Sequence, residues 1–222
     1  MNNRTALVFG GTGLVGGYLL EELVRLETYQ KIIVVSRRET DIKNDKISFV
    51  INRLEDPDEI SDLIRGNDLF CCLGTTIKKA GSREAFKKVD LFLPMKIAEI
   101  ASGNHVNNFA VISSIGADAG SKNFYLQVKG MMEQEVMKHP FEHTVIVRPS
   151  LLLGDRKEFR LSEKAAGMFM PLINPLLRGN WRRFRSIHGR AVAKAMINLV
   201  LFPRKKTIFE SDELSDVSNN DL

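Results

Sequence analysis

Tyr125 and Lys129 are the residues whose types and spacing best suit proton transfer. They stand four positions apart in a stretch expected to be helical, so both side chains would lie on one face, one turn apart. A phenol exchanges protons poorly at neutral pH, and a nearby ammonium group eases the exchange. We predict that Tyr125 is a general acid or base assisted by Lys129. A simple amphipathic surface pair is the alternative, since this spacing is common in helices.

Two serines precede this pair by about a dozen residues. Ser113 and Ser114 follow an apolar run expected to be a buried strand, and strand ends face the ligand crevice in a parallel sheet. A hydroxyl there would steady the oxygen atom that Tyr125 protonates or deprotonates. We predict that one of the two serines has this role, and the sequence leaves open which one.

A glycine cluster near the N-terminus indicates a second functional element. Gly10, Gly13 and Gly16 stand between an apolar run and an amphipathic stretch, which gives the order strand, tight turn, helix. Gly10 suits a sharp turn, Gly13 lets a pyrophosphate approach the backbone, and Gly16 lets the helix pack on its strand. The phosphates would lie at the helix N-terminus. An ordinary strand–helix turn is the alternative, and the flanking elements favour dinucleotide binding.

Arg37 and Arg38 follow the next expected strand, at the position where NAD-binding units carry an Asp or Glu for the ribose hydroxyl. Guanidinium groups instead suit the 2′-phosphate of NADP, to which they donate paired hydrogen bonds. We therefore favour NADP(H) over NAD as the cofactor. Two exposed strand-end arginines without a ligand are the alternative.

Alternating strands and helices are needed to position these residues. Strands are expected at Ala6–Phe9, Ile32–Val35, Ile47–Ile51, Leu69–Leu73, Asn108–Ile112 and Thr144–Val147, with an edge strand at Thr207–Phe209. Helices are expected at Leu14–Leu26, Pro57–Arg65, Arg83–Ser102, Asn123–Lys138 and Gly189–Phe202, the third kinked by Pro94. This alternation predicts an α/β fold, a doubly wound parallel sheet of the Rossmann type. Gly74 and Thr75, after the fourth strand, would lie beside the cofactor.

The length of 222 residues suits one domain. We expect a single Rossmann domain over residues 1–209, with a cofactor half over about 1–150 and a small C-terminal substrate-side lobe over about 151–209. Within that lobe we expect a helix over 162–178, broken by Pro171 and Pro175, and Met168, Phe169, Met170 and Trp181 either line the pocket or pack in the core. The acidic, polar residues 210–222 are expected to form a flexible tail.

Composition narrows the partners. The net charge is +5, and no apolar stretch is long enough to span a membrane. The histidines show no metal-ligand spacing, so no metal site is predicted. Arg182, Arg183 and Arg185 leave nucleic-acid binding as a disfavoured alternative. A small-molecule substrate, a monomer or homodimer, and a cytoplasmic location without a signal peptide are expected.

These motifs together resemble the short-chain dehydrogenase/reductase superfamily, in its atypical branch. Three further stretches are similar to the Tat-interacting-protein-like oxidoreductases, which bind NADP in a Rossmann fold: Cys71–Thr76 (CCLGTT), Ser113–Asp118 (SSIGAD) with Phe124–Gly130 (FYLQVKG), and Arg148–Leu153 (RPSLLL). The likeness covers the chain from Ala6 to about Phe202.

The resemblance implies roles for residues that spacing alone does not assign. It implies phosphate and ribose contacts from Thr12, Gly13, Leu14 and Val15, adenosine-phosphate contacts from Arg37 and Arg38, and contacts along the cofactor from Leu73 and Gly74. It places Tyr125 and Lys129 on the catalytic pair of the family, where they also contact the cofactor. The sequence shows no counterpart of the superfamily's catalytic asparagine.

Two functions follow from this combination. The first is an NADP-dependent oxidoreductase that transfers hydride between NADP(H) and an unidentified carbonyl or alcohol substrate at a Ser-Tyr-Lys site. The alternative is a non-catalytic NADP(H)-binding regulatory protein that acts through a protein partner.

Overall fold

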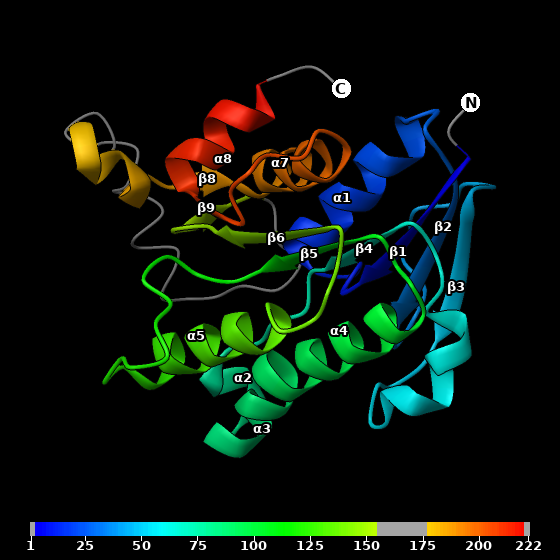
Figure 1. Cartoon of the computed structure of the whole chain (residues 1–222), viewed down its shortest axis with the longest axis horizontal. Helices are drawn as coiled ribbons and strands as arrows, with labels where there is room; N and C mark the ends of the chain where they lie inside the picture. Colours follow the sequence, from blue (N-terminus) through cyan, green and yellow to red (C-terminus); the bar gives the residue numbers. More distant parts are fainter. Residues whose placement is uncertain (1–2, 155–176, 220–222) are drawn as a thin grey trace.

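The computed structural model describes residues 3–154 and 177–219, and its centre is one sheet of seven parallel strands. The strands run in the order β3-β2-β1-β4-β5-β6-β9 across the sheet (Figure 1). Their bounds are β1 Arg4–Phe9, β2 Tyr29–Ser36, β3 Ile47–Ile51, β4 Asp68–Cys71, β5 Asn108–Ile112, β6 His143–Arg148 and β9 Ile208–Glu210. The predicted doubly wound parallel sheet is confirmed.

Helices cover both faces of the sheet. One face carries α1 Leu14–Arg25, α7 Gly189–Leu201 and α8 Ser211–Ser218; the other carries α2 Ile77–Ala80, α3 Arg83–Lys87, α4 Leu93–Gly103 and α5 Phe124–Val136 (Figure 1). A 3₁₀ turn, η1 Pro57–Leu63, stands where a short helix was predicted. Its N-cap is Asp56, whose side chain accepts a hydrogen bond from the Asp58 N–H.

The central strands are largely apolar because both of their faces are covered. In β1, Ala6 and Val8 pack in the core layer under α1 and α7, whereas Leu7 and Phe9 pack in the layer under α4 and α5. Successive side chains point to opposite faces, so each strand contributes to both layers.

The predicted helix over 83–102 is interrupted. A π turn, η2 Lys88–Phe92, separates α3 from α4 and ends one residue before α4 begins. We attribute the break to Pro94, because proline has no backbone N–H to donate to the Asp90 carbonyl, four residues before it. The Leu93 N–H bonds instead to the Lys88 carbonyl, five residues back.

The C-terminal region corrects one prediction. The flexible tail is wrong for Ser211–Ser218, which form α8 with Leu214 and Val217 buried. Glu210 and Glu213 cap its first turn reciprocally. Leu214 and Val217 are three positions apart, and two apolar residues in an acidic segment are too few to predict a helix from the sequence. In the fold they stabilise the helix because they pack against α7.

A small second sheet lies beyond β6. Leu152–Leu153 (β7) pairs in parallel with Ile187–His188 (β8), and a 3₁₀ turn, η4 Gly179–Phe184, precedes β8. These elements fall in the predicted substrate-side lobe. Most of the predicted broken helix, residues 162–176, lies outside the described residues. Met168, Phe169 and Met170 also lie outside them.

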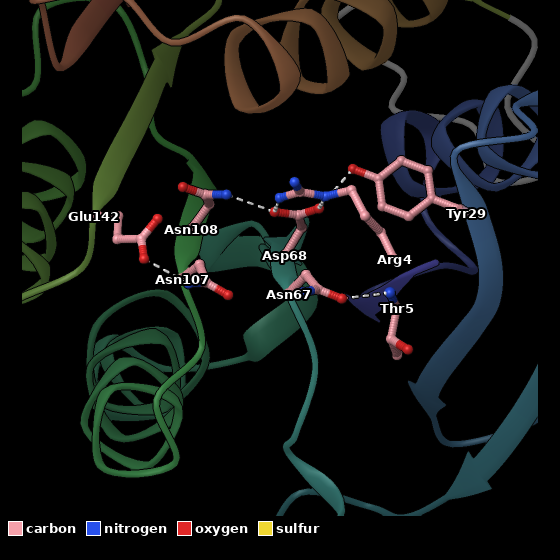
Figure 2. A network of polar contacts seen from close by, with 8 residues as sticks. All are labelled: Arg4, Thr5, Tyr29, Asn67, Asp68, Asn107, Asn108 and Glu142. Carbon is pink, nitrogen blue, oxygen red and sulfur yellow. Dashed lines mark hydrogen bonds and ion pairs between the residues drawn. The ribbon is translucent and has the colours of Figure 1, made fainter. Parts of the chain in front are cut away.

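A buried polar network joins the N-terminal ends of four strands, at the opposite end of the sheet from the glycine loop. The Asp68 carboxylate, fully buried, accepts hydrogen bonds from Arg4 at 2.6 and 2.7 Å, from the Tyr29 hydroxyl at 2.9 Å and from Asn108 at 2.7 Å (Figure 2). Burial, followed by the Asp68 charge, raises the pKa of Tyr29, so the phenol stays a donor. One carboxylate thus ties together β1, β2, β4 and β5.

Replacing Asp68 by Ala is expected to lower the free energy of unfolding by about 3–5 kcal/mol, because the buried donors lose their shared acceptor. Urea unfolding followed by circular dichroism measures the loss. Glu142→Ala is the matched control, since Glu142 accepts one exposed hydrogen bond from Asn107 at 2.6 Å, and should change stability by less than about 0.5 kcal/mol. Equal effects of the two substitutions would contradict the account.

Candidate cofactor and catalytic site

The glycine loop between β1 and α1 is closed so tightly that side chains are excluded from it. Gly10 has a φ of +82°, and a Cβ there would stand 2.6 Å from the Cys72 carbonyl oxygen. A Cβ on Gly16 would stand 2.2 Å from the Gly10 carbonyl oxygen, which already accepts the Gly13 N–H at 2.9 Å. The sharp turn predicted at Gly10 and the close packing predicted at Gly16 are both present in the fold.

The N-terminus of α1 is open to an anion. Gly13 is its N-cap and no side chain caps the first turn, which also holds no acidic residue. Thr12 and Gly13 are exposed, Leu14 is half-buried and Val15 is buried, so Leu14 and Val15 can contribute mainly through their backbone. Unpaired N–H groups and the helix dipole at such an end favour a phosphate.

Arg37 and Arg38 follow β2, at the same C-terminal end of the parallel strands as the glycine loop. Phe9, the last residue of β1, pairs with Val35, so the arginines follow directly beside the glycine loop. Both side chains are exposed, and within the described residues neither has a carboxylate in ion-pair range. The Ser36 hydroxyl donates to the Arg38 carbonyl at 2.5 Å and so fixes the turn. The two guanidinium groups are therefore available to a phosphate.

The segment after β4 forms the next part of the crevice. Leu73 is half-buried, Gly74 is exposed, and the Thr75 N–H donates to the Asp90 carboxylate at 2.9 Å. A Cβ on Gly74 would lie 3.5 Å from Asp90 Oδ1 and 4.0 Å from Lys129 Nζ. The predicted cofactor edge and the predicted catalytic lysine are therefore neighbours.

Lys129 forms a buried ion pair with Asp90. Its Nζ lies 2.8 Å from Asp90 Oδ1 and donates to the Ile112 carbonyl at 3.4 Å, and the two side chains are 5% and 1% exposed. Burial lowers the pKa of Lys129, but the paired Asp90 carboxylate, together with other neighbouring groups, more than offsets this effect, so the net pKa is raised. Lys129 is therefore an ammonium group at neutral pH.

Tyr125 lies in the first turn of α5, on the same face as Lys129. Asn123 caps this helix by accepting the Tyr125 and Leu126 N–H groups at 3.0 and 3.2 Å. The half-buried phenol ring lies 5.7 Å from the Phe86 ring of α3, centroid to centroid. Tyr125 and Lys129 both lie on α5, four positions apart. They therefore share one face of the helix, one turn apart, as their spacing predicts.

The two serines follow β5 and lie in different environments. Ser113 is 4% exposed, and its Oγ has no hydrogen-bond partner in the described part of the chain. Ser114 is half-buried and donates weakly to the Ile115 carbonyl at 3.4 Å. Ser114 is thus the more accessible hydroxyl.

The substrate-side elements leave Trp181 out of the core. Trp181 is 65% exposed and its ring lies 5.8 Å from that of Phe184, so the core-packing alternative is wrong. Arg182 pairs with Asp216 and Arg183 with Glu210, each at 3.4 Å. These pairs reduce the positive charge that a nucleic acid would meet.

Asp90 is the functional candidate that the sequence analysis missed. Its only signal in the sequence is an acid among apolar residues, Val89 and Leu91, just before Pro94.

Within the described residues, no group of three or more His, Cys, Asp or Glu side chains is arranged to hold a metal ion. None of the described helices combines the length and apolar character needed to cross a bilayer.

Comparison with known proteins identifies the family. The family model described as NAD(P)H-binding matches residues 10–173. The chain belongs to the NAD(P)H-binding family. This confirms the family that the motifs indicated. Protein HTATIP2 of Rattus norvegicus is 33% identical to this NAD(P)H-binding protein over 207 residues, covering 91% of this chain and 84% of the relative. Protein FMP52, mitochondrial, of Meyerozyma guilliermondii is 35% identical over 211 residues, covering 91% and 88%.

Solved structures confirm the fold of this NAD(P)H-binding protein. A short-chain dehydrogenase/reductase superfamily protein from Agrobacterium tumefaciens with bound NAD aligns with a TM-score of 0.71 at 18% identity, covering 94% of this chain and 78% of the other. Vestitone reductase from alfalfa aligns with a TM-score of 0.64 at 16% identity, covering 93% and 76%. At these identities the likeness concerns the Rossmann fold alone.

Proposed function

We propose that this NAD(P)H-binding protein is an NADP-dependent oxidoreductase of the atypical short-chain dehydrogenase/reductase type. Its substrate would carry a carbonyl or an alcohol group. The observation that carries the proposal is the placement of Tyr125 and a buried, charged Lys129 on one helix face beside Gly74. A proton donor, Tyr125, and a cation, Lys129, are thus on the helix that lies beside Gly74, at the same end of the parallel strands as the glycine loop.

The described residues fit a phosphorylated dinucleotide. The uncapped start of α1 suits the pyrophosphate, which Thr12, Gly13, Leu14 and Val15 would surround. Arg37 and Arg38, exposed and without a carboxylate partner in the described chain, suit the 2′-phosphate that distinguishes NADP from NAD. Leu73, Gly74 and Thr75 would border the nicotinamide half.

The chemistry would divide between cofactor and protein. The nicotinamide, when bound, supplies or accepts the hydride. Tyr125 gives its phenolic proton to the substrate oxygen in reduction, or removes one in oxidation. Lys129 holds the ribose hydroxyls and places a positive charge on the same helix face as the phenol. Ser114 orients the substrate oxygen, with Ser113 as the alternative.

Titration with NADPH and NADH tests the cofactor, with nicotinamide fluorescence as the readout. Wild type is expected to bind NADPH more tightly than NADH. Arg37→Asp should weaken NADPH binding about 10- to 100-fold, because it replaces a charge-assisted hydrogen bond by repulsion, and should change NADH binding less than about 3-fold.

Arg204→Asp is the matched control, since Arg204 is exposed in the loop before β9, at the opposite edge of the sheet. It makes the same charge change and should leave both affinities unchanged. Absence of binding to either nucleotide in wild type would refute the oxidoreductase proposal. Equal affinities for the two, insensitive to Arg37, would refute NADP specificity alone.

The cytoplasmic location stays a prediction. The FMP52 relatives carry "mitochondrial" in their names, and a location in that organelle is the competing hypothesis for this chain. Fractionation of cells that express the tagged full chain distinguishes the two.

A further inference from the structure

Asp90 owes its place to the π turn that interrupts the 83–102 helical stretch. The wider turn Lys88–Phe92 follows from the missing N–H of Pro94, as described above. The turn places the Asp90 side chain against Lys129 of α5, where it is 1% exposed. A carboxylate is expensive to bury, so its contacts indicate why it is tolerated.

Both contacts of this carboxylate belong to the candidate site. Oδ2 accepts the Thr75 N–H at 2.9 Å, from the segment that would border the nicotinamide. Oδ1 lies 2.8 Å from Lys129 Nζ as an ion pair, although it has no aligned hydrogen-bond donor in the described structure. Asp90 therefore links the cofactor edge to the lysine on α5.

The groups that face Lys129 come from several elements. They are Asp90 from η2, Tyr125 from α5, Cys71 from β4 and the Ile112 carbonyl from β5. Burial raises the pKa of Cys71 to about 12, so this thiol is uncharged at neutral pH. Among these groups, Asp90 is the one whose full charge compensates the buried ammonium.

We propose that Asp90 is a positioning residue that keeps Lys129 protonated and directed at the ribose of the bound nucleotide. The inference rests on the proposed function, because it assigns Lys129 a contact with NADPH. It predicts that NADPH affinity in wild type is insensitive to pH over the range in which a buried lysine without a counter-ion would lose its proton.

The test compares NADPH affinity at about pH 7 and about pH 9.5 in wild type and Asp90→Asn. Above about pH 7 the 2′-phosphate of NADPH is already ionised. Without Asp90, burial lowers the pKa of Lys129, so the ammonium contact is lost as the pH rises. Affinity of the variant should fall about tenfold across this range, and that of wild type less than about twofold.

Three further variants separate positioning from structure. Lys129→Met should bind NADPH weakly at both pH values, and adding Asp90→Asn to it should change nothing more. Asp90→Glu restores the charge and should restore the flat profile. A flat profile with wild-type affinity in Asp90→Asn would overturn the proposal.

Unfolding of the protein without nucleotide gives a readout independent of NADPH. In Asp90→Asn the folded lysine has a lowered pKa, so the unfolded chain binds more protons and stability rises with pH up to about 10. The double variant Asp90→Asn/Lys129→Met lacks this rise, and so does wild type. If wild type binds no NADPH, the proposed function fails while this comparison still decides the pairing.

Instability of Asp90→Asn is also informative. If Asp90→Asn does not fold but the uncharged double variant Asp90→Asn/Lys129→Met does, the unpaired lysine charge is the cause and the pairing is supported. If neither folds, Asp90 is a structural residue of the π turn and the proposal is wrong.

Discussion

Gly16→Ala is expected to abolish NADPH binding, with a loss of about 100-fold or more. The added Cβ would stand 2.2 Å from the Gly10 carbonyl oxygen and 3.0 Å from Gly11 Cα. Both atoms are backbone, so relief requires α1 to move away from the loop. That carbonyl also accepts the Gly13 N–H at 2.9 Å, and any movement therefore opens the turn that presents the helix N-terminus to phosphate.

Gly17→Ala provides a matched control one residue away in the same helix. Among the described residues, its Cβ would meet only the Gly11 carbonyl oxygen, at 3.8 Å, which is an ordinary contact. Replacing a helical glycine by alanine should stabilise the fold by about 0.5–1 kcal/mol and leave NADPH affinity unchanged. Fluorescence titration and thermal unfolding of both variants measure the difference. Equal loss of binding in the two would show that helix composition, not the close approach, matters.

The pattern of apolar runs predicts most of this fold because the sheet is buried on both faces. Ile47–Ile51 and Asn108–Ile112 are strands with the predicted bounds. The pattern fails where tertiary packing decides the outcome. Ser211–Ser218 form α8 because Leu214 and Val217 pack against α7. The polar composition of this segment does not predict that contact.

The candidate site could be predicted only where residue type and spacing carry the information. The glycine loop and the Tyr125–Lys129 pair are local motifs. The loop follows β1, and Lys129 on α5 lies beside Gly74, which follows β4, the neighbour of β1 in the sheet. Asp90 is separated from Lys129 by 39 positions, and their contact depends on a π turn. No local pattern specifies that contact, so a single sequence does not reveal it.

Tyr125→Phe is expected to lower turnover about 10²- to 10⁴-fold, because it removes the proton donor and nothing else. The Phe ring retains the contact with Phe86, now 5.7 Å between centroids, and the helix cap at Asn123 uses only the backbone of this residue. NADPH affinity should fall less than about threefold, since one neutral hydrogen bond is lost. Oxidation of NADPH with a panel of aldehydes, ketones and quinones measures the turnover.

Tyr18→Phe is the control for this substitution, because Tyr18 lies on α1 against His188 and Arg190, outside the Tyr125–Lys129 face. It should leave turnover unchanged. Turnover that survives in Tyr125→Phe assigns the proton to another donor, and Ser114 would be tested next. If wild type binds NADPH but reduces no carbonyl in the panel, the catalytic proposal loses its support. The non-catalytic regulator then becomes the better account, because the same glycine loop and arginines would serve binding alone.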